Sequence, residues 1–122
     1  TFRYRSILLP NGLMLKYPGL TATEDDITYR SRNGKTYIWG GMLLENIIQA
    51  LSRCVIAENM LAIGDFGHFV ATMTHDEIVT IVPDETAEQD YADIERIMTT
   101  PPIWAPDLPL AVEGDLDDRY TK

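Results

Sequence analysis

The chain has 122 residues, of which 45% are apolar, with two Trp, six Tyr and three Phe; this suffices for one hydrophobic core and argues against disorder. Its formal charge of −9 comes from 19 acidic and 10 basic residues, the opposite of the balance expected for a nucleic-acid-binding surface. The single cysteine excludes an internal disulfide framework and a cysteine-based metal cluster.

The charges are unevenly distributed along the chain. After Asp65 there are 13 Asp or Glu against three Lys or Arg, whereas the first 65 residues hold six acids and seven bases, so the first half can still face phosphates. We find no continuous apolar stretch near the roughly 18 to 20 residues that span a bilayer, and no leader-like start. We therefore expect a cytoplasmic protein outside the membrane. The start at Thr1, without Met, fits a piece of a longer polypeptide.

Two β-hairpins are predicted in the first 39 residues. The predicted strands are Ser6–Leu9, Leu13–Tyr17, Ile27–Arg32 and Lys35–Trp39. The first two flank Pro10-Asn11-Gly12, and the second two flank Asn33-Gly34, which predicts a two-residue type I′ turn because Asn-Gly tolerates positive φ angles. The second hairpin mixes rings and cations, as a ribbon holding a phosphate backbone does, although ordinary strand composition explains them almost as well. These residues are Tyr29, Arg30, Arg32, Lys35 and Tyr37.

A long helix is predicted over Met42–Ile63, with Gly64 ending it. Apolar residues at 43, 44, 47, 48, 51, 55 and 61 predict one broad buried face, and Cys54 is assigned to the core. A polar stripe runs beside this face, since residues three and four apart are neighbours on a helix. Its members are Glu45, Asn46, Gln49 and Arg53. Gln and Arg suit acceptors on sugars, phosphates or base edges, but a solvated face is the alternative interpretation.

The second half predicts a third hairpin and a second helix. His68–Thr74 and Ile78–Val82 are β-prone runs on either side of His75-Asp76-Glu77. Asp84-Glu85-Thr86 offers N-cap oxygens to a helix over Ala87–Met98, which Pro101-Pro102 ends. The remaining segments are an irregular Trp104–Pro109, a short strand Leu110–Glu113 and a fraying tail Gly114–Lys122.

His75-Asp76-Glu77 is the unusual local feature, because three ionisable side chains interrupt an otherwise apolar pair of strands. Charges are costly to desolvate, so these must reach solvent or find a cation. Strand side chains alternate between faces, so only one of the two acids is well placed as a metal ligand. A solvated turn that merely favours Asp is the alternative interpretation of the tripeptide.

Three blocks in a fixed order carry a resemblance to family A (DNA polymerase I-like) DNA polymerases, especially phage forms. The blocks are Leu9 to Pro18, Trp39 to Arg53 and Thr74 to Val79. The first is similar to the family's L-P-S/D-G-R-x-L-x-Y-P segment, the second to its G-G-x-x-x-E-N-x-x-Q-A-x-x-R helix, and the third to its motif C, H-D-E. The end of the chain, from Pro101 to Lys122, also resembles the family's carboxyl end.

The resemblance implies roles for individual residues. Asp76 matches the motif C aspartate that binds the catalytic metals, Glu77 its acidic neighbour, and His75 the residue beside the primer terminus. Gln49 matches the helix glutamine that touches DNA near the primer–template junction, with Glu45, Asn46 and Arg53 as companions. The chain departs from the family at Cys54, often Asp, and at Leu13 and Met14, where Arg or Lys is usual.

The fold expected from both arguments is α+β: antiparallel β-hairpins packed with two helices, as one domain over residues 1–122. The resemblance makes this a partial palm subdomain, the C-terminal portion, with the fingers and motif A absent. It implies Mg²⁺, primer–template DNA and dNTP in the parent enzyme, two-metal nucleotidyl transfer, and no activity in the isolated chain. Apolar surface normally covered by the rest of the polymerase would favour self-association.

Two rival functions remain open at the level of sequence. The first is a non-enzymatic acidic α+β interaction domain, such as a phage accessory protein, in which His75-Asp76-Glu77 is only a turn. The second is a metal-dependent hydrolase, which is weaker because one carboxylate pair and two distant histidines make too few ligands.

Overall fold

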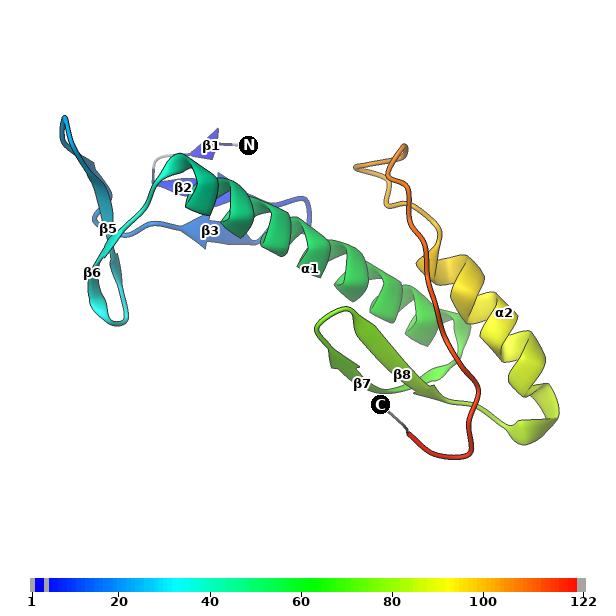
Figure 1. Ribbon diagram of the computed structural model, residues 1–122. Helices are drawn as coiled ribbons and strands as arrows, with labels where there is room; N and C mark the ends of the chain where they lie inside the picture. Colours follow the sequence, from blue (N-terminus) through cyan, green and yellow to red (C-terminus); the bar gives the residue numbers. More distant parts are fainter. Residues whose placement is uncertain (1, 4, 121–122) are drawn as a thin grey trace. The chain divides into compact units, whose positions relative to one another are not determined.

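The computed structural model describes residues 2–3 and 5–120 (Figure 1). Its contacts divide it into two compact units, Thr1–Cys54 and Val55–Lys122, and each is described by itself. The described part of the chain is α+β, with antiparallel sheets and two α-helices. The boundary falls within the first α-helix, so each unit contains part of it.

The first unit contains two small antiparallel sheets. One has the order β1-β2-β3 and the other β4-β5-β6. The strands are β1 (Phe2–Arg3), β2 (Ser6–Leu8), β3 (Met14–Lys16), β4 (Thr21–Ala22), β5 (Ile27–Ser31) and β6 (Gly34–Tyr37). The β2–β3 hairpin is confirmed, with Gly12 at φ 84° in its turn. The buried ring of Tyr17 meets Tyr29 edge to face, with centroids 5.2 Å apart, and so packs β5 against the segment after β3.

The β5–β6 hairpin is also confirmed, but its turn differs from the prediction. Ser31 pairs with Gly34, so the loop residues are Arg32 and Asn33 instead of Asn33 and Gly34. A type I′ turn needs positive φ at both loop residues, and here the positive φ, 105°, is at Gly34. The Ser31 hydroxyl accepts from the Asn33 amide at 3.1 Å and holds this turn.

Helix α1 (Gly40–Phe66) is longer at both ends than predicted. Gly64 lies inside it, and Gly67, at φ 109°, ends it. The Gly67 amide donates to the Gly64 carbonyl at 3.0 Å and the His68 amide to the Ile63 carbonyl at 3.2 Å. These two bonds form a Schellman motif, which satisfies carbonyls that the helix itself leaves unpaired. The assignment of Gly64 as the terminal glycine was therefore wrong.

The buried face of α1 is narrower than predicted. Cys54 is confirmed as a core residue at 1% exposure, and Ile56, Asn59 and Ile63 are buried at i, i+3 and i+7. In contrast, Leu44, Ile48 and Leu61 are more than half exposed, although they were assigned to the buried face. The helix carries apolar residues around more of its circumference than the described neighbouring elements cover.

By length and composition, α1 is a candidate membrane span, with a mean hydropathy of 1.3 over an 18-residue window of which 22% is buried. The sequence has no uninterrupted apolar run of that length, whereas an average over a window admits scattered polar residues. The core helix of a soluble protein passes the same test.

The second unit contains one β-ribbon, a helix and a returning chain. Strands β7 (Phe69–Thr74) and β8 (Glu77–Ile81) pair antiparallel, with a register shift between Val70 and Thr72. Helix α2 (Ala87–Met98) has the predicted bounds. It is preceded by a 3₁₀ turn, η1 (Asp84–Thr86), in the segment that was expected to supply only N-cap oxygens. Thr86 makes no side-chain cap bond to the α2 backbone; its hydroxyl donates instead to Asp90 at 2.6 Å.

The chain after α2 folds back onto the unit. Asn59 donates to the Met98 carbonyl at 3.3 Å, and the Trp104 indole donates to Glu58 at 2.9 Å. The predicted strand over 110–113 is absent from the described residues, which have no sheet partner there. The tail predicted to fray is attached at two points instead. The Tyr91 hydroxyl donates to the Gly114 carbonyl at 3.0 Å, and Tyr120 reaches β8.

Candidate functional site

The β7–β8 ribbon positions the acidic tripeptide. Its strands are rich in Val, Ile and Thr, which favour pleated structure. Thr74 pairs with Glu77, so the loop consists of His75 and Asp76 only, and Glu77 is the first residue of β8. His75 has a φ of 54°, the positive value that a two-residue hairpin loop needs at its first position. The predicted three-residue tip is therefore two residues long.

Asp76 is exposed at this tip. Within residues 2–3 and 5–120 its carboxylate takes part in no hydrogen bond or ion pair. The expectation that the charge reaches solvent is thus met for Asp76, which is exposed. His75 is also exposed, on the same two-residue loop.

Glu77 has different surroundings from Asp76. It is half-buried, and its Oε2 accepts a hydrogen bond from the Tyr120 hydroxyl at 3.0 Å. This bond is the main reason that the pKa of Tyr120 is raised above its ordinary value of 10.0. Tyr120 lies 43 residues away in sequence, and no local pattern signals its contact with the ribbon. Tyr120 was therefore not among the predicted site residues.

The described residues contain no group of three or more His, Cys, Asp or Glu that could hold a metal ion. Carboxylate oxygens are the donors that Mg²⁺ prefers, so Asp76 fits as one ligand. The neighbouring Glu77 is held by Tyr120, and one carboxylate does not complete an octahedral site. The remaining ligands would have to come from outside these residues.

The polar stripe lies on α1 within the first unit. Glu45, Gln49 and Arg53 are exposed and spaced four residues apart, so they share one side of the helix. Asn46 is half-buried and donates to the Tyr17 hydroxyl at 3.4 Å, which gives it a packing role beside any other. The tripeptide belongs to the second unit. That the stripe and Asp76 serve one DNA site therefore stays a prediction.

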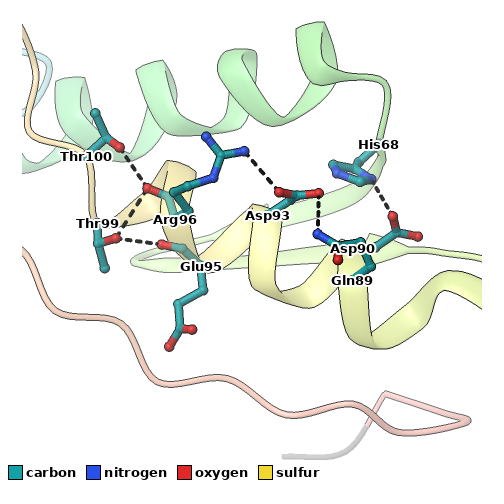
Figure 2. A network of polar contacts seen from close by, with 8 residues as sticks. All are labelled: His68, Gln89, Asp90, Asp93, Glu95, Arg96, Thr99 and Thr100. Atoms are coloured by element: carbon teal, nitrogen blue, oxygen red, sulfur yellow. Dashed lines mark hydrogen bonds and ion pairs between the residues drawn. The ribbon is translucent and has the colours of Figure 1, made fainter.

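A polar network on α2 was not anticipated from the sequence (Figure 2). Arg96 donates to Asp93 at 3.0 Å, and Gln89 donates to the same carboxylate at 3.2 Å. Both bonds lower the pKa of Asp93 below its usual 3.8, and the bond from Arg96 has the larger effect. The Arg96 guanidinium also lies 5.5 Å from the Phe66 ring centroid. The spacing of three and four residues was the available signal. The network anchors α2 to the end of α1 and carries no site chemistry.

His68 is a packed side chain at the start of the β7–β8 ribbon. Its side chain is 10% exposed, its Nδ1 lies 3.9 Å from an Asp90 oxygen, and its ring stacks at a tilt on Phe66 with centroids 5.5 Å apart. Its Nε2 is buried without a hydrogen-bond partner among the described residues. This histidine directly precedes β7 and lies outside the loop of His75 and Asp76, and the described residues place no metal-ligand group around it.

The comparisons with known proteins bear on the whole chain. Over its full length it is 34% identical, in an alignment of 137 residues, to a DNA polymerase of Bacillus phage SP02. The chain spans 21% of the length of that polymerase. No protein-family model matches the chain, and no solved structure matches it. The chain is thus similar, from end to end, to one part of a phage DNA polymerase.

Proposed function

We propose that the chain is a segment of a DNA-directed DNA polymerase of family A, the part of the palm that carries motif C. The observation that carries the proposal is the 34% identity to a phage DNA polymerase along the entire chain, because this span includes both the acidic ribbon and the polar helix. Asp76 supports the proposal because it presents an exposed carboxylate, a ligand type that Mg²⁺ prefers, at the tip of a paired ribbon.

Each residue has a specific task in this proposal. The carboxylate of Asp76 is one ligand for Mg²⁺, and the paired strands β7 and β8 hold the loop that carries it. Glu77 adds negative charge beside it, and His75 lies next to the primer terminus. Bound Mg²⁺ supplies activation of the primer 3′-oxygen and neutralises charge on the triphosphate. A second carboxylate and the cations that hold the triphosphate come from other segments of the polymerase.

The polar stripe of α1 contacts the DNA in this proposal. Gln49 and Arg53, both exposed, donate to acceptors on the minor-groove edge or sugar–phosphate backbone near the primer–template junction. Glu45 and Asn46 have supporting roles; the Asn46 bond to Tyr17 ties this side of the helix to the segment after β3. The partners are primer–template DNA and dNTP, and the chain alone has no polymerase activity because it supplies only one half of the metal site.

Replacing Asp76 by Ala in the polymerase that contains this segment tests the proposal. Primer extension should fall by several orders of magnitude because a metal ligand is lost, while primer–template affinity, measured by fluorescence anisotropy, should stay nearly unchanged. Asp107→Ala is the matched control, since it removes an exposed carboxylate from the loop after α2. Extension by Asp76→Ala at the rate of the control would exclude Asp76 as a metal ligand.

A further inference from the structure

The β4-β5-β6 sheet holds two cations in direct opposition. Arg30 on β5 is the cross-strand partner of Lys35 on β6, so both side chains stand on the same face. Like charges directly opposite each other destabilise an antiparallel pair. Among the described residues neither cation forms an ion pair with an acid. The repulsion is therefore uncompensated within this part of the chain, and an anion between the two would relieve it.

The same face is hollowed at this point. A cavity of about 380 Å³ is lined by both cations and by the hydroxyl residues Thr21 and Thr28, with no Asp or Glu in its wall. Thr21 and Thr28 are cross-strand partners, and their hydroxyl oxygens lie 3.1 Å apart. Hydroxyl groups and cations together are the donors that proteins present to phosphate oxygens.

The backbone around the cavity fixes the position of Arg30. Its amide donates to the Pro18 carbonyl at 2.7 Å. Gly19, at φ 64°, lies so close that a Cβ there would be 3.8 Å from the Cβ of Arg30. The stem of the arginine thus runs beside a glycine turn, in a place set by the chain.

We propose that this cavity binds a backbone phosphate of a DNA strand, held between Arg30 and Lys35. A DNA strand fits better than a small free anion because both cations are exposed and the face continues to an aromatic ring. Tyr37 is 57% exposed, and the Lys35 ammonium lies 5.8 Å from its ring centroid. An exposed ring beside cations is the platform on which single-stranded DNA stacks a base. The proposal rests on the proposed function in naming DNA as the partner.

Anisotropy of a labelled single-stranded oligonucleotide tests this binding, with the 122-residue chain and its variants. Arg30→Gln and Lys35→Gln should each weaken binding several-fold and reduce the slope of log affinity against log salt by about 0.7. Lys16→Gln, which removes an exposed cation from β3 outside the cavity, is the matched control and should change neither slope nor affinity comparably. Equal losses of affinity in all three variants would show that DNA is attracted by general positive charge, and would contradict a specific site at Arg30 and Lys35.

A second measurement separates binding from folding. Without DNA, Lys35→Gln should melt at a higher temperature than the wild type, because it removes the repulsion with Arg30. Added oligonucleotide should raise the melting temperature of the wild type and raise that of the variant less. A variant that melts lower and is stabilised equally by DNA would contradict the proposal.

Two further arms identify the partner. Inorganic phosphate that displaces the oligonucleotide at equal concentration of phosphate groups would assign the cavity to small anions and overturn the DNA proposal. If oligonucleotide binding depends on Arg30 and Lys35 but the parent protein extends no primer, the phosphate site is supported and the polymerase function is rejected. If Asp76→Ala abolishes primer extension but oligonucleotide binding does not depend on Arg30 or Lys35, the polymerase function is supported and the phosphate site is rejected.

Discussion

At the tip of the β7–β8 ribbon, two adjacent carboxylates differ in exposure and in hydrogen bonding. Asp76 is exposed and has no partner in the described chain, whereas Glu77 accepts the hydroxyl of Tyr120. The hydrogen bond occupies one oxygen of Glu77 and restrains its rotamer. It therefore leaves Asp76 as the carboxylate without a competing hydrogen bond among the described residues.

The Tyr120 contact should be visible in its titration. Because its pKa is raised, the contact contributes stability that is fully present below the ordinary pKa of 10.0 and is lost as pH rises through the folded-state value. Ultraviolet difference titration of the wild type against Tyr120→Phe isolates one of the six tyrosines, with a midpoint above 10.0. Glu77→Gln removes the charge that holds the proton and should lower that midpoint; an unmoved midpoint would contradict the contact.

The two residues of this contact show what sequence patterns can and cannot predict. Asp76 could be predicted at a solvent-reaching tip because β-prone runs flank it directly and its charge is costly to bury. Tyr120 could not, because its partner is 43 residues away and the intervening chain has no regular structure after Met98. Contacts made by irregular segments leave no periodicity in the sequence.

At the scale of elements, the end of α1 distinguishes two glycines. Gly64 lies inside the helix with open space around its Cβ position, whereas Gly67 has a φ of 109° and closes the Schellman motif. Gly64→Ala should stabilise the chain by roughly 0.5–1 kcal/mol, since alanine loses less backbone entropy in a helix. Gly67→Ala should destabilise it by about 1–2 kcal/mol, because a Cβ is strained at that φ.

Urea denaturation followed by circular dichroism measures this pair. Each variant is the control for the other, because both add one methyl group within four residues of the same helix end. If Gly64→Ala were the destabilising substitution and Gly67→Ala were not, Gly64 instead of Gly67 would mark the helix end.

Element type was easier to predict than element ends. The three hairpins and two helices follow from turn residues and from the period of apolar side chains, and the bounds Ala87–Met98 of α2 were predicted as they are. The predicted turn, Asn33-Gly34, is one residue later in the chain than the observed turn, Arg32-Asn33. The sequence Asn33-Gly34 fits a type I′ turn, but it fits equally a turn in which only Gly34 has a positive φ. The exposed Leu44 and Ile48 were misplaced because periodicity reports an apolar face but not which part of it is covered.

At the scale of the whole chain, the distribution of charge follows the two proposed tasks. The 13 acids after Asp65 accompany the ribbon that offers Asp76 to a cation, and the seven bases of the first 65 residues include both cations of the β5–β6 face. Net charge alone argues against nucleic acid, but binding responds to the local field of a face. The negative total is therefore compatible with DNA contacts made by the first unit.

Self-association is the prediction that belongs to this scale. The ribbon that ends in Asp76 has an apolar base, where Phe69 and Ile81 are cross-strand partners exposed by 65% and 63%. Adjacent exposed apolar side chains on a strand pair form a patch that favours association, whereas single ones do not. We expect the weight-average mass in sedimentation velocity to rise with concentration for the wild type. It should rise less for the double variant Phe69→Thr, Ile81→Thr.

Ile103→Thr is the control for this experiment. Ile103 is 99% exposed, but it follows two prolines in a loop and has no strand partner, so its removal should leave the association unchanged. Association that persists in the double variant and disappears in the control would place the contact at the loop after α2.

In the proposed polymerase the apolar base of the ribbon is covered by other segments, so the polymerase containing both Phe69→Thr and Ile81→Thr should lose stability while Asp76 stays at the tip of the ribbon. We therefore expect the polymerase with both substitutions to melt at a lower temperature than the wild type and to retain metal-dependent primer extension.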